Sequence, residues 1–354
     1  MRYWRGRTAR FVEVNGGGSL ERQSLAAEQL PSANGSVRGQ TPIGGRIDLS
    51  GVFSVTYQPL RVSSQMSQAA PPDGSGAQDL APAQGIVDQT WLATMVSGTA
   101  SRKWSPRRRL EASVTALRLD PIRGVGDDSR SQSVSVRERW NANPRAELSY
   151  GYTYRQNRQG EPLPGTSNRL GLHAADGGLR IEKRLSSVRM LTFAIRGGIA
   201  YSTPYEVAGA SSSGSWLPVV SGAFQANLSQ AWDLSVTASH EVTVLTGVTP
   251  QPFTTDQVST QVTGNLTDRL RIGLTGAYSQ GTTVDSGPGS FEGGTGTVQV
   301  QYGLARWCGV FSSYSYYEHR LREISSAPAS VPSQYGRHAV RVGVSFWVPL
   351  YGTF

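Results

Sequence analysis

The sequence predicts an all-β fold, namely a single antiparallel up-and-down barrel whose strands cross a membrane. Three observations predict it. Apolar and polar residues alternate with the period of two that is typical of strands. Short and long connections follow one another in turn, and amphipathic aromatic residues gather at both ends of the strands. The chain of 354 residues contains no run of eighteen apolar residues, so we expect no transmembrane helix.

The composition of the chain excludes several kinds of partner and site. The formal net charge is +9, and nearly all of the positive charge is arginine, because Lys103 and Lys183 are the only lysines. The arginines are spread along the chain at a mostly constant parity, and they do not form a basic run with aromatics, so we expect no nucleic-acid partner. Cys308 is the single cysteine, which excludes an internal disulfide and a multi-cysteine metal site. The sequence indicates no cofactor and no catalytic residue.

The first 45 residues are predicted to be a separate N-terminal segment, followed by a barrel domain over 46–354. Three alternatives stay open for residues 1–45: extra strands, at 10–14 and 36–40, a plug, or a disordered arm. Residues 1–9 are polar and Arg-rich, and no apolar stretch of the kind that signal peptides contain follows them. We therefore expect that the signal peptide of an exported protein is not present in this chain.

The first half of the barrel begins with a strand at 46–57 and a Pro/Gly/Ser/Gln-rich loop at 60–88. Further strands are predicted at 89–104, 109–120, 134–140 and 145–155, with turns at 105–108 and 141–144. In the strand 109–120 the apolar parity changes near Ala116, because Leu117 and Leu119 break it. This change indicates either a bulge or the end of the regular strand.

The second half continues the same alternation. Strands are predicted at 166–185, with a bulge near 176–178, and then at 191–201, 216–228, 232–244, 258–266, 270–280, 294–304, 307–317 and 337–354. From residue 46 onward this makes fourteen strands, joined by seven long and six short connections. A hairpin before residue 45 would raise the number to sixteen. Short periplasmic turns and long extracellular loops are typical of transmembrane barrels.

The two faces of these strands differ in charge. If the apolar parity faces lipid, the other parity holds thirteen basic residues, namely Arg109, Arg137, Arg139, Arg145, Arg155, Arg169, Arg180, Arg184, Arg196, Arg269, Arg271, Arg337 and Arg341. It holds six acidic residues, Asp48, Glu111, Glu147, Glu182, Asp233 and Glu241. The predicted pore-lining residues are Arg109, Arg137, Arg139, Arg145, Arg155, Arg169, Arg196, Arg269, Arg271 and Arg341. Charges on the lipid parity lie near strand ends, where a basic side chain costs less than the roughly 2–4 kcal/mol of the bilayer midplane.

Aromatic residues separate this reading from a soluble all-β fold. Five tryptophans lie beside short turns or near the C-terminus: Trp104, Trp140, Trp232, Trp307 and Trp347. Four tyrosines lie toward the long loops on the apolar parity: Tyr57, Tyr154, Tyr201 and Tyr278. Two such belts are typical of the two interfaces of a membrane, whereas a soluble core concentrates these residues in mid-strand.

The last strand carries a resemblance. Apolar residues alternate through Val340, Val342, Val344 and Phe346, and the chain ends on Phe354. This pattern resembles the closing strand of bacterial outer-membrane β-barrels, in which a terminal aromatic residue serves as an assembly signal. The resemblance implies an outer-membrane location, with outer-membrane lipid and the barrel-assembly machinery as partners, and it raises the homo-oligomer of porins as one expectation. The arginine-rich inner parity is also similar to that of barrels associated with exopolysaccharide export.

Three functions are compatible with these features. The first is a porin-like channel that passes anionic or polar solutes, because arginine lowers the barrier for anions. The second is a non-conducting docking barrel of an exopolysaccharide or secretion system, in which the arginines pair with inward carboxylates. The third and weakest is an outer-membrane hydrolase, because His240 and Glu241 are neighbours on opposite faces and Asp127–Asp128 fits a solvated turn.

Overall fold

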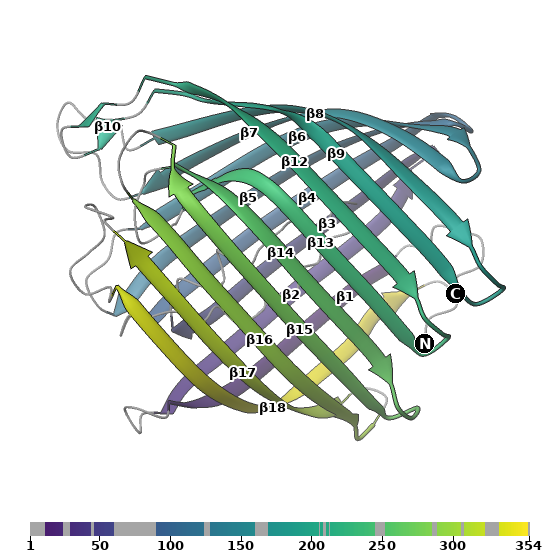
Figure 1. Cartoon of the computed structure of the whole chain (residues 1–354). Helices are drawn as coiled ribbons and strands as arrows, with labels where there is room; N and C mark the ends of the chain where they lie inside the picture. Colours follow the sequence, from purple (N-terminus) through teal and green to yellow (C-terminus); the bar gives the residue numbers. More distant parts are fainter. Residues whose placement is uncertain are drawn as a thin grey trace.

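A computed structural model gives the fold of the chain (Figure 1). The structure describes residues 11–23, 29–43, 46–59, 90–123, 128–159, 169–204, 206–207, 210–211, 213–244, 252–284, 289–305, 308–322 and 333–352. The predicted loop at 60–88 and the terminal Phe354 lie outside the described residues. Among the described residues there is no helix that is long and apolar enough to cross a membrane.

Strands make up the described chain. The first nine are β1 (Phe11–Gln23), β2 (Gln29–Ile43), β3 (Ile47–Pro59), β4 (Thr90–Ser105), β5 (Arg108–Arg123), β6 (Ser129–Asn143), β7 (Ala146–Gln159), β8 (Arg169–Arg184) and β9 (Met190–Ser202). The others are β10 (Glu206–Val207), β11 (Ala210–Ser211), β12 (Ser215–Asn227), β13 (Trp232–Val244), β14 (Pro252–Asn265), β15 (Leu270–Thr283), β16 (Ser290–Gly303), β17 (Cys308–Arg322) and β18 (Gln334–Gly352).

Sixteen of these strands form one closed antiparallel barrel. Consecutive strands of the chain pair with each other, except that β9 pairs with β12, and β1 pairs with β18 to close the ring. The prediction of fourteen strands after residue 45 is confirmed, and β1 and β2 are the additional hairpin that raises the number to sixteen. The short strands β10 and β11 pair only with each other at the loop end of the barrel (Figure 1). The sequence predicted that segment as a loop.

The connections separate by length between the two ends of the ring. One end carries the short turns, such as 106–107 and 144–145, and the strand ends Phe11 and Gly352, which pair with each other. At the other end longer stretches of sequence separate consecutive strands, for example Pro59 of β3 from Thr90 of β4 and Arg322 of β17 from Gln334 of β18. We call these the turn end and the loop end. This arrangement follows from up-and-down topology, in which every second connection returns to the same side.

The outer face of the barrel is apolar. Exposed side chains on the predicted lipid parity include Val114 on β5, Val134 on β6, Phe193 on β9 and Val298 on β16. The opposite parity points inward and is mostly polar, with Ser113 and Ser135 hydrogen-bonded across β5 and β6 at 2.7 Å. Strand periodicity therefore determined the facing correctly for these strands.

Aromatic side chains lie at both ends of the apolar face. Trp104 and Trp140 are exposed at the turn end. At the loop end Tyr278 is exposed, and the rings of Tyr201 and Trp216 contact at a centroid distance of 4.9 Å. Such belts are typical of a barrel at its two membrane interfaces.

The structure corrects two predicted irregularities. The pairing of β8 with β7 and β9 has no register shift, so the bulge predicted near 176–178 is wrong. The strand β5 likewise continues in regular pairing with β6 past Ala116. Leu117 and Leu119 face inward, where they pack against the buried Ala93 of β4. The apolar residues that suggested a bulge are therefore an inward apolar patch at the loop end.

The ring of Trp232 lies on a glycine of the next strand. Trp232 and Gly264 are Cα partners on β13 and β14, and a Cβ added at Gly264 would lie 2.2 Å from Cδ2 of the indole. The indole fills the space next to the backbone that the missing side chain of Gly264 leaves open, an arrangement called aromatic rescue. We expect Gly264→Ala to displace Trp232 and to lower the free energy of unfolding by about 1–3 kcal/mol, as overpacking does.

Thermal or urea unfolding of the folded barrel, followed by tryptophan fluorescence, measures this effect. The control is Gly276→Ala on β15, where an added Cβ has no heavy atom within 4 Å. Equal stability losses in the two variants would mean that the indole does not pack on Gly264.

Candidate functional site

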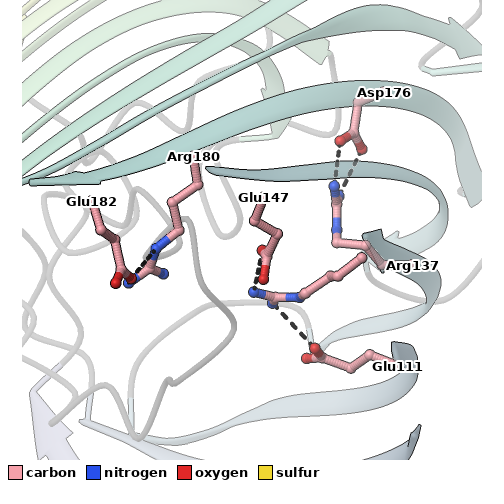
Figure 2. Close-up of polar contacts among 7 residues, drawn as sticks. Glu111, Arg137, Glu147, Asp176, Arg180 and Glu182 are labelled. Atoms are coloured by element: carbon pink, nitrogen blue, oxygen red, sulfur yellow. Dashed lines mark hydrogen bonds and ion pairs between the residues drawn. The ribbon is translucent and has the colours of Figure 1, made fainter. Parts of the chain in front are cut away.

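The inner wall formed by β5 to β9 carries most of the predicted charged residues. Arg137 on β6 donates two hydrogen bonds to Asp176 on β8, from Nη1 to Oδ1 at 2.6 Å and from Nη2 to Oδ2 at 2.8 Å (Figure 2). The two residues are two strands apart, because Gly151 of β7 is the Cα partner of both. A Cβ at Gly151 would lie 3.1 Å from Cζ of Arg137, so the glycine provides the space for the guanidinium to cross β7.

Arg139 lies one rung closer to the turn end and contacts carboxylates on both neighbouring strands. Its Nη2 is 3.1 Å from Oε2 of Glu111 on β5, and its Nη1 is 3.5 Å from Oε1 of Glu147 on β7. On β8, Arg180 pairs with Glu182, two residues away on the same face, at 3.1 Å (Figure 2). The wall is therefore an alternating network of guanidinium and carboxylate groups.

Arg155 and Arg196 belong to the same wall. Arg155 on β7 and Arg196 on β9 have the inward parity, and both are half-buried. Arg196 lines a recess in the wall together with Arg139, Glu147, Arg180 and Gln225. Arg341 of β18 is also half-buried and inward, opposite Ser313 of β17. The structure thus brings Arg137, Arg139, Arg155 and Arg196 together on one sector, and Arg341 lies apart from them.

The other predicted pore residues lie elsewhere. Arg109 and Arg271 have the inward parity but are exposed near the turn end of β5 and β15. Arg145 and Arg269 lie in the short turns that precede β7 and β15.

The prediction that Arg169 lines the pore is wrong. It depended on the bulge in β8, and without a register shift Arg169 shares the outward parity of the exposed Ile181. For the same reason Asp176 was missed as an inward carboxylate. Asp176 has the same parity as Arg180 and Glu182, and this shared parity was the signal that could have identified it.

The wall across the barrel is different. At the loop end of β14, β16 and β17, the inward residues Phe253, Phe291, Tyr317, His319 and Leu321 are all buried. The rings of Phe253 and Phe291 meet edge to face at 5.3 Å, and those of Tyr317 and His319 lie 5.5 Å apart. In the closed ring, β16 and β17 lie half-way round from β6 and β7. The interior therefore has one charged wall and one aromatic wall, and sequence periodicity did not indicate the second.

The histidines outside this wall face outward. Nδ1 of His240 is 2.7 Å from Oδ1 of Asp256, and Nδ1 of His173 is 2.6 Å from the hydroxyl of Tyr152. His240 faces outward and Glu241 inward, as predicted for neighbours on a strand, so they do not form a dyad. Asp128 pairs with Arg130 at 3.2 Å, and Asp127 lies outside the described residues. Within the described ranges, no group of three His, Cys, Asp or Glu side chains is placed to hold a metal ion.

Comparison with solved structures relates the fold to outer-membrane barrels. The chain is similar to Pseudomonas aeruginosa OccK2 (OpdF) in complex with glucuronate, with 11% identity and a TM-score of 0.51 over 97% of this chain and 98% of that one. It is similar to Acinetobacter baumannii OccAB4, with 10% identity and a TM-score of 0.50 over 98% of this chain and 99% of that one.

The chain is also similar to CdiB from Acinetobacter baumannii, with 9% identity and a TM-score of 0.55, covering 97% of this chain and 60% of that one. No model of a protein family matches the chain, and no curated protein is similar to it in sequence. The fold is that of bacterial outer-membrane β-barrels, as the closing strand suggested.

Proposed function

We propose that this chain is an outer-membrane channel that passes anionic or polar solutes along an arginine-bearing wall. One observation carries the proposal: adjacent strands β6 to β9 project Arg137, Arg139, Arg155 and Arg196 into a closed ring of sixteen strands. Rings of sixteen to eighteen strands leave an aqueous lumen in porins, whereas rings of eight are filled by side chains. The apolar outer face supports insertion into a bilayer.

The donors on this wall suit particular solutes. Guanidinium groups bind carboxylate and phosphate in bidentate geometry, so sugar acids and phosphorylated solutes are the classes that we propose. OccK2, to which the fold is similar, was solved in complex with the sugar acid glucuronate. The proposal for this chain rests on its own arginines.

A second candidate is a non-conducting docking barrel of an exopolysaccharide or secretion system. Two observations favour it. The carboxylates of Asp176, Glu111 and Glu147 already pair with Arg137 and Arg139, which reduces the charge available to a solute. The aromatic wall is also closely packed at the loop end.

Conductance of the purified protein in a planar bilayer tests the two candidates. For the channel we expect stepwise conductance, and a salt gradient should give a reversal potential whose sign corresponds to a preference for anions. Protein that inserts without conducting would support the docking barrel. Conductance with a preference for cations would contradict the proposed role of the arginines.

A further inference from the structure

Four arginines form a row on the outer surface near the loop end. The register pairs Arg118 of β5 with Arg130 of β6, Arg130 with Arg158 of β7, and Arg158 with Arg169 of β8. The side chains of directly opposed residues lie on the same face of a sheet. Each of the four shares the parity of an exposed outward residue on its strand, namely Val114, Val134, Tyr152 and Ile181. We call these four residues the arginine row.

The arginine row lies beyond the apolar band. One rung closer to the turn end, the outward residues are Ala116, Gln132, Gln156 and Gly171, which are also in register. One rung further are Val114, Val134, Tyr154 and His173. Four residues along a strand span about 13 Å, and a tilt near 45° makes this about 9 Å along the membrane normal. A line of directly opposed residues runs across the tilted strands, so the row extends obliquely over about 10 Å along the membrane normal. It therefore crosses the zone where the apolar band ends and polar lipid groups begin.

Charge in the row is only partly compensated. Nε of Arg118 is 2.8 Å from Oδ1 of Asp120, and Nη2 of Arg130 is 3.2 Å from Oδ2 of Asp128. Among the described residues these are two carboxylates for four guanidinium groups. Like charges directly opposite each other across a ladder destabilise a sheet. An anion that bridges neighbouring guanidinium groups would remove that repulsion.

The described outer surface of β16 and β17 near the loop end carries no such cationic excess. On the outer face of β16 and β17 near the loop end, Glu292 accepts a hydrogen bond from Tyr278 at 2.7 Å. Glu318 pairs with Arg320 at 2.9 Å, and Arg322 lies two residues further. The charges that the structure describes there balance, two acidic against two basic, so this sector supplies a matched control.

We propose that the arginine row binds the phosphate groups of an anionic glycolipid in the outer leaflet. Four guanidinium groups over three strand spacings extend about 14 Å, which is enough to bind two phosphates of one headgroup in bidentate fashion. The amide groups of Gln132 and Gln156, one rung below, suit the hydroxyl and amide groups of a sugar. This inference rests on the outer-membrane location in the proposed function and is independent of whether the lumen conducts.

Native mass spectrometry of the detergent-purified barrel tests the proposal. The probes are lipid A with two phosphates and the same lipid with both phosphates removed. We expect Arg158→Gln/Arg169→Gln to bind the phosphorylated lipid about thirtyfold more weakly than the unsubstituted protein, because each arginine near an anionic surface contributes a factor of about five. The control Arg320→Gln/Arg322→Gln should bind it as the unsubstituted protein does.

Three outcomes would overturn the proposal. The first is that the unsubstituted protein binds the phosphorylated and the dephosphorylated lipid equally well. The second is that Arg158→Gln/Arg169→Gln binds the phosphorylated lipid as tightly as the unsubstituted protein does. The third is that an equal concentration of inorganic phosphate displaces the lipid, which would indicate a free-anion site. Bilayer conductance of the same samples is a separate readout, and we expect both double variants to conduct as the unsubstituted protein does. Lipid binding without conductance would reject only the channel, and conductance without lipid binding would reject only the arginine row.

Discussion

Val298→Arg is expected to prevent assembly of the barrel in a membrane, whereas Gln299→Arg is expected to be tolerated. Val298 lies in the middle of β16 with its side chain outward and 44% exposed, and Gln299 is the next residue and points inward. An arginine that faces lipid near the midplane costs roughly 2–4 kcal/mol, and one that faces an aqueous lumen avoids that cost. The two substitutions add the same charge one residue apart, so only the facing differs.

Folding into lipid vesicles, followed by the change in gel mobility between unheated and heated samples, measures assembly. Val342→Arg on β18, where the valine is 60% exposed, should fail in the same way as Val298→Arg. If Val298→Arg and Gln299→Arg assembled equally well, the outer face would not be the lipid face.

Asp176→Asn is expected to increase the preference of the channel for anions, and Arg137→Gln is expected to decrease it. The pair is half-buried in the inner wall, with 14% and 15% of the side chains exposed, and its charges cancel. Removing either partner leaves one net charge at the same place. In water a unit charge about 8 Å from a passing ion contributes about 0.5 kcal/mol, with opposite sign for an anion and a cation. We therefore expect each ratio of anion to cation permeability to change about fivefold at low salt.

The reversal potential under a salt gradient measures both changes, which should have opposite signs. Arg320→Gln removes the same kind of charge from the outer surface and should leave the ratio unchanged. Shifts in the same direction for Asp176→Asn and Arg137→Gln would indicate that the substitutions distort the wall instead of changing its potential.

Part of the candidate site could be predicted from the chain alone. Arg137, Arg139, Arg155 and Arg196 have the parity opposite to that of the apolar residues on their own strands, so periodicity assigned them to the inner face. Arg169 was assigned to the wrong face, and Asp176 was missed, for the same reason. Gly177 and Gly178 resembled a bulge, and a bulge reverses the facing of every residue on one side of it. The regular ladder on both edges of β8 decides against it.

The sequence by itself determined the all-β class, the number of strands after residue 45, the apolar outer face and the positions of the aromatic belts. These features depend on alternation within one strand and on turn residues beside it, so they need no knowledge of neighbours. Only the tertiary structure decided which charged residues meet. Arg137 reaches Asp176 across Gly151 because both are Cα partners of that glycine. The register of four strands likewise places Arg118, Arg130, Arg158 and Arg169 directly opposite one another. Register is a property of paired strands, and a single strand does not contain it.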